Sequence, residues 1–272
     1  MIIDIHTHAF PSKIAEKTMG KLGKIAGIPY YGDGTSDAVQ KNIEKAGVDV
    51  AVILTIATRP DNIEKINDYA MERDGFISGN EKYARHMRFC SVHPDSPNAV
   101  EELVRLKNKG VKGVKFHPDY QEFMIDDKKM YPIYEAVSEL GLVAVFHAGY
   151  DPLSPELIHA LPEASARVLA DFPKMKTVLA HLGGMHRFDE VNEYLAGRFP
   201  NLYLDTAFLS QHISPERLVK TIGLRGADKI LFGSDFPWSE SLAELLFIEA
   251  LPVGRTEKDL IMGDNARELL GI

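Results

Sequence analysis

Residues 1–8 read MIIDIHTH, and this stretch decides the fold prediction because an apolar, strand-like run ends there in His6 and His8. In an extended strand alternate side chains share a face, so the two Cβ atoms lie on one side, about 7 Å apart. Two imidazoles placed in this way can reach one metal ion. A His-x-His pair is also common at solvated strand ends, so its weight depends on how the later strands end.

Strand-like and helix-like segments alternate along the whole chain without a break in composition, which is typical of a parallel sheet built from βα units. Eight strands are predicted, at residues 2–6, 50–56, 87–93, 111–117, 142–147, 177–181, 202–207 and 229–235. Helical spacing occurs at residues 99–109, 130–140, 156–172, 188–198, 215–222, 240–250 and 257–270. Eight such units in about 250 residues predict an α/β fold, a (β/α)8 TIM barrel that forms a single domain over residues 1–272.

One predicted connection, residues 9–36, is much longer than the usual strand-to-helix link of about 2 to 6 residues. It follows the first strand and is rich in glycine and proline. One interpretation is a partly helical surface excursion, with residues 14–22 as a short amphipathic piece. The other is a lid over the active-site mouth that shapes the substrate pocket.

Composition places the chain among ordinary globular proteins, with 45% hydrophobic and 26% charged residues. The net charge of −8 argues against a non-specific nucleic-acid surface. Cys90, the only cysteine, lies in an apolar run, where a small buried hydrophobe is expected rather than a reactive thiol. No basic leader and no apolar run of about 18 residues is present, so we expect a cytoplasmic protein without a membrane partner.

Residue types that bind metals recur at the ends of later strands. The fifth predicted strand ends at His147, the sixth at His181, and the eighth at Asp235. Barrel enzymes build their sites from such strand ends. Imidazoles and a carboxylate buried together cost desolvation, whereas a divalent cation satisfies them jointly. Three imidazoles and one carboxylate suit zinc, with manganese or iron as alternatives.

These motifs resemble a known family. The HTH of residues 6–8, the FHAG of residues 146–149, the AHLGG of residues 180–184 and the GSDFP of residues 233–237 resemble, in this order, the motifs of the amidohydrolase superfamily. The chain is most similar to the amidohydrolase-related branch, which includes aminocarboxymuconate-semialdehyde decarboxylase, resorcylate-type decarboxylases and hydrolases. The resemblance extends to the GDNAR run of residues 263–267.

The resemblance implies one divalent ion held by His6, His8, His147 and Asp235. It also implies that His181 is the base or acid that hydrogen-bonds the metal-bound water. A cation lowers the pKa of such a water towards about 7, and a nearby imidazole can then exchange a proton at neutral pH. Asp235 is the alternative proton acceptor, as its counterpart is in many hydrolases of the superfamily.

Two further polar residues precede and follow Phe116 in the GVKFHP run of residues 113–118. Lys115 and His117 alternate with apolar residues, so both are expected to point into the barrel mouth. A substrate contact is predicted for His117. Lys115 has two interpretations: a carboxylated bridge between two ions, as in two-metal members of the superfamily, or a buried ion pair. The branch that this chain resembles usually carries a single metal.

Other candidates each keep an alternative. Arg59 either clamps a substrate carboxylate or is an exposed loop arginine, and Trp238 either floors the pocket or packs in the core. His93 either lines the pocket or bonds to backbone, and Asp205 is expected to order a neighbouring side chain. Surface positions are expected for His86, His159, His186 and His212.

The leading functional prediction is a metal-dependent hydrolase of a small amide, lactone or related ester, which acts through a metal-activated water. Its rival is a non-oxidative decarboxylase of a small aromatic or dienoic acid on the same site. A decarboxylase needs a cation for the substrate carboxylate, and Arg59 and Lys115 are the visible candidates.

Functions from other classes fit less well. A binding barrel without catalysis is disfavoured because every expected ligand position holds a ligand-type residue. A metal-dependent phosphoesterase or nuclease is disfavoured by the acidic charge. Nucleophile-elbow, phosphate-loop and dinucleotide-binding motifs are absent from the sequence. The expected partner is therefore a small-molecule substrate, with no nucleic acid, and homo-oligomer formation stays open.

Overall fold

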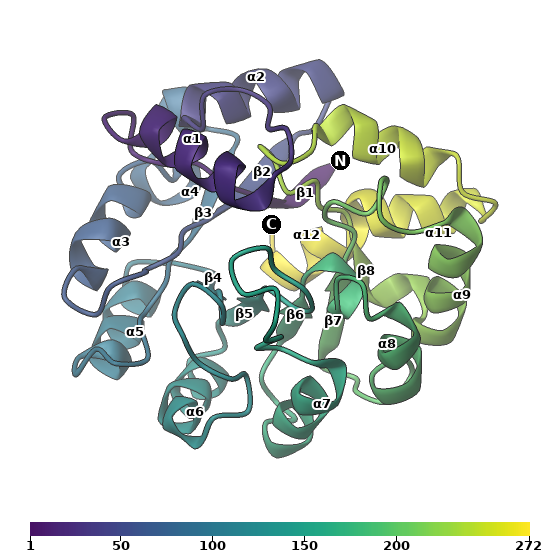
Figure 1. Ribbon diagram of the computed structural model, residues 1–272. Helices are drawn as coiled ribbons and strands as arrows, with labels where there is room; N and C mark the ends of the chain where they lie inside the picture. Colours follow the sequence, from purple (N-terminus) through teal and green to yellow (C-terminus); the bar gives the residue numbers. More distant parts are fainter. The chain divides into compact units, whose positions relative to one another are not determined.

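The computed structural model describes residues 1–272, with its elements labelled in Figure 1. The strands are β1 (Ile3–Thr7), β2 (Val50–Leu54), β3 (His86–Phe89), β4 (Gly113–Phe116), β5 (Val143–Phe146), β6 (Thr177–Leu179), β7 (Leu202–Asp205) and β8 (Ile230–Leu231). The helices are α1 (Ala15–Ala26), α2 (Ser36–Ala46), α3 (Ile63–Met71), α4 (Gly75–Ser78), α5 (Ala99–Asn108), α6 (Tyr131–Glu139), α7 (Pro162–Asp171), α8 (Phe188–Tyr194), α9 (Pro215–Arg225), α10 (Ser241–Glu249), α11 (Arg255–Asp259) and α12 (Asn265–Leu270).

The strands lie in two parallel sheets that follow chain order, β1-β2-β3 and β4-β5-β6-β7-β8. In β4 and β5 the register pairs Gly113 with Val143 and Phe116 with Phe146. Nearly every strand residue is buried. Burial on both faces explains why the strands read as continuous apolar runs rather than as alternating ones.

All eight predicted strands are present, but most end before the predicted residue. The eighth was predicted over residues 229–235, yet β8 covers only Ile230–Leu231. The residues that follow β8 are buried but are not part of the strand. Among them, Asp235 adopts a positive φ of 64°. His6 lies within β1, and the other candidate metal ligands lie just beyond the ends of their strands, where barrel enzymes carry their functional groups.

The chain packs as two compact units. Unit 1 consists of residues 1–53, 85–87 and 205–272, and unit 2 of residues 54–84 and 88–204. The single domain expected for residues 1–272 stays a prediction.

In unit 1, helix α1 occupies much of the long connection at residues 9–36. It runs from Ala15 to Ala26, past the predicted piece, and it buries Met19. Helix α2 follows, capped by the Thr35 hydroxyl, which accepts a hydrogen bond from the Ala38 amide. It lies beside α10 (Figure 1), where Asn42 donates to the Ser241 hydroxyl at 2.6 Å. That the connection covers the active-site mouth stays a prediction.

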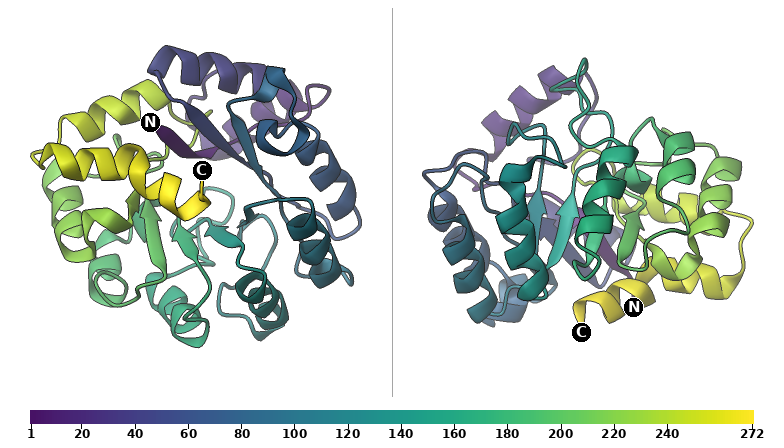
Figure 2. Two further views of the ribbon diagram at one scale, coloured as in Figure 1. Left: turned by 180° about the vertical axis from the view of Figure 1, so that it is seen from behind. Right: turned by 90° about the horizontal axis from the view of Figure 1, so that it is seen from below.

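The C-terminal helix of unit 1 corrects one prediction. A single helix was predicted at residues 257–270, but a wider π-helical turn at Leu260–Asp264 separates α11 from α12. This turn lets the Ile261 carbonyl accept from the Phe232 amide at 2.8 Å. It also brings Gly263 so close to the chain start that an added Cβ would lie 1.9 Å from the Met1 carbonyl. The two termini accordingly lie near each other (Figure 2).

In unit 2, helices α5, α6 and α7 flank the outer side of strands β4, β5 and β6 (Figures 1 and 2). Gly113 lets β4 approach the preceding strand, because an added Cβ would lie 2.2 Å from the Phe89 ring. The helix predicted at residues 156–172 begins only at Pro162. The preceding residues form turns, and the Ala160 carbonyl accepts from the Gly149 amide at 3.0 Å. None of the helices is both long and apolar enough to cross a membrane.

Candidate metal centre

Unit 1 brings His6, His8 and Asp235 together at the end of β1. The Nε2 atoms of His6 and His8 lie 3.2 Å apart. Oδ1 of Asp235 lies 3.4 Å from His6 Nε2 and 3.2 Å from His8 Nε2. All three residues are buried. Three potential ligand atoms therefore form a nearly equilateral triangle.

This triangle fits a divalent ion. Zinc bonds to nitrogen and oxygen of about 2.0 to 2.1 Å imply ligand atoms about 3.3 Å apart at the corners of a tetrahedron. The three measured separations of 3.2 to 3.4 Å match that spacing. The donor set of two imidazoles and one carboxylate also suits manganese and iron.

Asp205 orients one of these imidazoles. Its Oδ2 accepts a hydrogen bond from His6 Nδ1 at 2.8 Å, and its Oδ1 accepts one from the Ala207 amide at 3.1 Å. A proton on Nδ1 leaves the lone pair on Nε2, the atom that faces His8 and Asp235. The expectation that Asp205 orders a neighbour corresponds to this hydrogen bond.

The backbone holds the carboxylate in place. The Asp235 amide donates to the His6 carbonyl at 2.8 Å, and the His8 amide donates to the Phe236 carbonyl at 2.7 Å. The positive φ of Asp235 turns the chain sharply there. The two segments that carry the ligands are thus joined to each other directly.

A further buried carboxylate, Asp4, lies in β1 two residues before His6. It accepts hydrogen bonds from the hydroxyls of Ser234 at 2.6 Å and Ser241 at 2.7 Å. Burial raises the pKa of Asp4 to about 6, and these hydrogen bonds oppose the rise. Asp4 thereby ties the start of β1 to the loop that carries Asp235.

Unit 2 places His147 and His181 against each other, directly after β5 and β6. His181 Nε2 lies 3.1 Å from His147 Nδ1, and both residues are buried. Gly149 makes this approach possible, since an added Cβ would lie 2.0 Å from the Met185 amide nitrogen. The two loops are joined by the Met185 amide, which donates to the Ala148 carbonyl at 2.9 Å.

His117 joins the same group from the end of β4. Its ring stacks on His147 with centroids 4.3 Å apart and on Tyr120 with centroids 3.8 Å apart. Asp151 Oδ2 lies 3.7 Å from Nε2 of both His117 and His147. His117, His147 and Asp151 form a second group whose ligand atoms all lie within 4.8 Å of one another.

Sequence reasoning missed two carboxylates of unit 2, Asp119 and Asp151. Asp119 accepts hydrogen bonds from His159 Nδ1 at 2.9 Å and from the Ser154 hydroxyl. Burial raises the pKa of Asp119. The available signal was position, because both residues follow a strand-end histidine by two or four residues.

Gln121 was also missed. Its side chain accepts from the His117 amide at 2.9 Å and donates to the carbonyls of Ala57 at 2.8 Å and Val92 at 2.9 Å. One buried amide thus fixes the chain just beyond β2, β3 and β4. No periodic pattern in the sequence indicates such a role.

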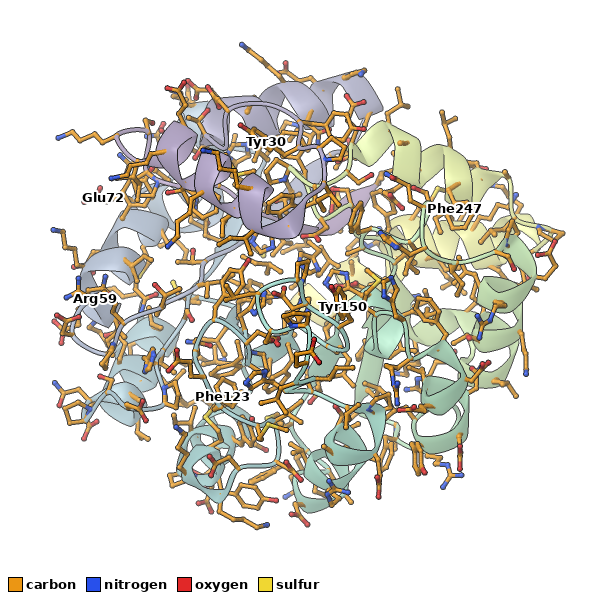
Figure 3. The ribbon with its side chains drawn as sticks, viewed as in Figure 1. Tyr30, Arg59, Glu72, Phe123, Tyr150 and Phe247 are labelled. Atoms are coloured by element: carbon orange, nitrogen blue, oxygen red, sulfur yellow. The ribbon has the colours of Figure 1, made fainter.

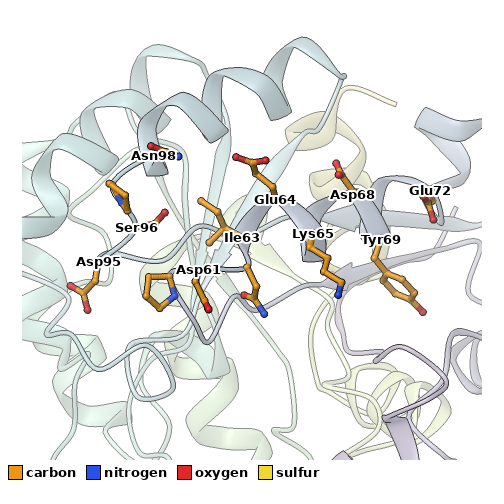
Figure 4. A pocket seen from close by; sticks show the side chains of 13 residues that line it. Asp61, Ile63, Glu64, Lys65, Asp68, Tyr69, Glu72, Asp95, Ser96 and Asn98 are labelled. Atoms are coloured by element: carbon orange, nitrogen blue, oxygen red, sulfur yellow. The ribbon is translucent and has the colours of Figure 1, made fainter.

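Arg59 lies apart from the histidines of unit 2. It projects outward before α3 (Figure 3), and its guanidinium forms a 2.5 Å ion pair with Asp61 although both side chains are more than 60% exposed. Beside it is a surface hollow whose lining includes Asp61, Asp68, Glu72 and Asp95 (Figure 4). Substrate binding by Arg59 stays a prediction, but its position favours the alternative of an exposed loop arginine.

The remaining candidates occupy varied positions. Trp238 is half-buried, and its amide donates to the Asp235 carbonyl at 2.8 Å. Lys115 is fully buried in β4, and its role as a metal bridge stays a prediction.

His93 is buried, which lowers its pKa, and its Nδ1 accepts a hydrogen bond from the Asp95 amide at 3.2 Å. Cys90 is buried as predicted, and burial raises the pKa of its thiol.

Of the four histidines expected at the surface, only His186 is exposed, and His212 is half-buried. The prediction for His86 is wrong, because this residue lies within β3 and is only 1% exposed. His159 is half-buried through its contact with Asp119. These three positions were mispredicted because burial depends on neighbours that are distant in the sequence.

The chain is similar to known proteins over nearly its whole length. A family model described as Amidohydrolase matches residues 3–272. The curated 2-amino-3-carboxymuconate-6-semialdehyde decarboxylase of Dictyostelium discoideum is 24% identical over 209 residues, which make up 64% of this chain and 58% of that protein. The aligned stretches span about half of the length of the curated relatives.

Solved structures establish the fold. An uncharacterised TIM-barrel protein of Bordetella bronchiseptica has a TM-score of 0.73 at 16% identity and covers 99% of this chain and 98% of its own. A dihydroxybenzoic acid decarboxylase of Polaromonas, with bound manganese, has a TM-score of 0.68 at 17% identity. The match covers 99% of this chain and 96% of the Polaromonas chain. These likenesses confirm the predicted (β/α)8 barrel.

Proposed function

The chain belongs to the amidohydrolase family, as its motifs predicted, and from this premise we propose that it is a metal-dependent hydrolase of a small amide, lactone or related ester. The triangle of His6, His8 and Asp235 carries the proposal, because its separations of 3.2 to 3.4 Å suit one divalent ion. The family resemblance adds His147 as a fourth ligand. We propose zinc, with manganese as the alternative because the Polaromonas decarboxylase has it bound.

The ion would supply Lewis-acid polarisation of a carbonyl oxygen and a water of lowered pKa. The chain's own residues would orient the ligands of the ion and transfer protons. Asp205 holds His6 through Nδ1, so that Nε2 keeps its lone pair. His181 takes a proton at a ring nitrogen and returns it to the leaving group, and Asp235 is the second acceptor. His117 and Trp238 are proposed to contact the substrate.

The charges in unit 2 favour an uncharged substrate. Next to His117 and His147 lie the carboxylates of Asp119 and Asp151, at 3.7 to 4.0 Å. These carboxylates would repel a carboxylated substrate. The exposed Arg59 is paired with Asp61. Hydrolysis of a neutral carbonyl compound is therefore the better fit.

A decarboxylase is the second candidate, because the Dictyostelium relative and the Polaromonas neighbour are both named decarboxylases. The two reactions release different products, so one assay separates them. Protein loaded with zinc or manganese is incubated with lactones, cyclic amides and esters and, in parallel, with aromatic and dienoic acids. We expect acid release from the first group and no carbon dioxide from the second. Carbon dioxide without hydrolysis would replace the proposal by its alternative.

The small-molecule substrate class follows from the family. A cytoplasmic location and the absence of nucleic-acid or membrane partners stay predictions. Metal removal by a chelator should abolish turnover, and adding back zinc or manganese should restore it. Turnover that persists in fully metal-free protein would contradict the proposed chemistry.

A further inference from the structure

The loop that follows β7 carries a phenylalanine close to His6 in unit 1. We infer that this residue, Phe208, selects substrates that bear an apolar ring beside the carbonyl group. The inference rests on the proposed function and names the substrate class for it. Phe208 offers no ligand atom and no proton, so it acts on the part of the substrate that does not react.

Phe208 follows a point at which three strand ends meet. The strands β7 and β8 are neighbours in the sheet (Figure 1), and the Gly233 amide donates to the Thr206 hydroxyl at 3.2 Å. An added Cβ on Gly233 would lie 2.9 Å from the His6 Cβ and 3.3 Å from the Ala207 Cβ. Ala207 is thus packed close to the candidate ligand His6, and Phe208 is the next residue along the chain.

The backbone at Phe208 is strained. Its φ is +58°, in the left-handed region that a bulky residue rarely adopts. A glycine would adopt this conformation without the steric cost. The other non-glycine residues with a positive φ include the candidate ligand Asp235 and the proposed proton carrier His181. Strain of this kind persists at binding and catalytic sites, where the surrounding structure holds a side chain in a required place.

The ring of Phe208 is fixed by a neighbour but keeps a small exposed area. It meets the His212 ring edge to face, with centroids 4.6 Å apart and an interplanar angle of 68°. His212 is half-buried, and Phe208 is 9% exposed. The ring is therefore held in one place while part of its surface stays open to a contact.

A buried carboxylate fixes the loop of Phe208 against the loop of Trp238. Glu244, in α10, accepts from the Ser210 amide at 3.0 Å and from the hydroxyls of Ser210 and Ser239, both at 2.7 Å. Ser210 follows Phe208 by two residues. Ser239 directly follows Trp238, which is proposed to contact the substrate. Glu244 is thus a positioning residue, because it ties the loops of both aromatic side chains to one anchor.

Two aromatic residues on loops tied in this way favour an apolar group on the substrate. A ring on the substrate gains from burial against Phe208 and Trp238 and from edge-to-face or offset contact with them. A small aliphatic lactone presents the same carbonyl group without this gain. An apolar pocket discriminates by about 10- to 200-fold for a single methylene-sized group, so the preference for a ring is measurable.

Two lactones separate the role of Phe208 from the chemistry. δ-Valerolactone and dihydrocoumarin share a six-membered lactone ring, and only dihydrocoumarin carries a fused benzene ring. In metal-loaded protein, Phe208→Ala should lower kcat/KM for dihydrocoumarin by about 10-fold or more, mainly through KM, and that for δ-valerolactone by less than about twofold. Phe208→Leu should restore most of the loss, because leucine keeps an apolar side chain. Equal losses for both lactones, or no loss for dihydrocoumarin, overturn the inference.

Binding is measured in parallel, so that the inference and the proposed function can fail separately. Ligand-observed NMR reports the binding of dihydrocoumarin without any turnover. Wild type that binds dihydrocoumarin but hydrolyses neither lactone contradicts the proposed function alone, and loss of that binding in Phe208→Ala then supports the inference. Binding that is unchanged in Phe208→Ala overturns the inference, as does a wild type that binds neither lactone.

A stability comparison tests the strain. Phe208→Gly and Phe208→Ala lose the same ring, but only glycine accepts a φ of +58° without steric cost. The thermal midpoint of Phe208→Gly should therefore lie above that of Phe208→Ala. Exposed Gln211, which has no positive φ, is the matched control. There the Gly variant should be the less stable one, because glycine gives the unfolded chain more freedom. A lower midpoint for Phe208→Gly than for Phe208→Ala overturns the inference.

Discussion

The histidine groups of the two units differ in how closely their ligand atoms approach. In unit 1 the separations are 3.2 to 3.4 Å, and in unit 2 the corresponding distances are 3.7 Å. The first group is tied together by backbone hydrogen bonds between the segments of His6 and Asp235. Asp235 and Asp151 both lie on loops, but the backbone amide before Asp151, that of Tyr150, donates to Met185 and not to the segment of His117. A direct backbone hydrogen bond between the segments of two ligands preorganises the first group for an ion.

The largest expected effect tests the tighter group. Either His6→Ala or His8→Ala should remove the ion and reduce turnover to background, because each change takes away one imidazole of the proposed ligand set. Elemental analysis of purified protein measures the loss. Unchanged metal content in these variants would show that the triangle is not the metal site.

The second effect separates proton transfer from ligation. His181→Asn should keep the metal while lowering turnover by on the order of 10²-fold or more, because Asn cannot exchange a proton near neutral pH. Metal content and kcat are measured on the same preparation, with exposed His186→Asn as the control. Loss of an ion from the His181 variant would make His181 a ligand.

Orientation within unit 1 should matter less than ligation. Asp205→Asn weakens the hydrogen bond to His6 Nδ1, so metal affinity should fall by about 10- to 100-fold. Competition with a chromophoric chelator gives the dissociation constant. Asp228→Asn provides a control outside the histidine group. Wild-type affinity in the Asp205 variant would mean that the backbone alone holds His6 in place.

The fourth effect separates substrate binding by His117 from metal binding by His6, His8 and Asp235. His117→Ala is expected to raise KM for the true substrate while leaving the ion of unit 1 in place. Steady-state kinetics and elemental analysis report the two effects separately. The outcome that breaks the distinction is loss of the unit 1 ion, which would make His117 one of its ligands.

The smallest effect concerns a buried carboxylate of unit 1 outside both groups. Glu244 accepts hydrogen bonds from the hydroxyls of Ser210 and Ser239, and burial raises its pKa above the ordinary 4.5. The folded state then binds the proton more tightly than the unfolded state, so stability from this group falls as pH rises through that window. Glu244→Gln should flatten the dependence of the unfolding free energy on pH from about 4.5 upwards. Denaturant titrations of metal-free protein at several pH values measure this dependence. If Glu244→Gln leaves it unchanged, the pKa of Glu244 is not raised by folding.

Local patterns explain why the barrel and its main candidates could be predicted. Apolar runs and helical spacing depend on neighbouring residues, so all eight strands appeared where expected. Boundaries were less accurate. The helix predicted at residues 257–270 is interrupted because Gly263 packs against Met1, a contact between the two ends of the chain that no local window contains.

The sequence by itself determined the α/β barrel, the family and the strand-end positions of the metal-type residues, because periodicity and motif order are properties of the chain. Only the tertiary structure decided which side chains meet. Asp205 bonds His6 across 199 residues, Asp119 and Asp151 face His117, and Asp61 holds Arg59 at the surface. Such pairings follow from packing and from the desolvation of charges, which depend on the whole fold.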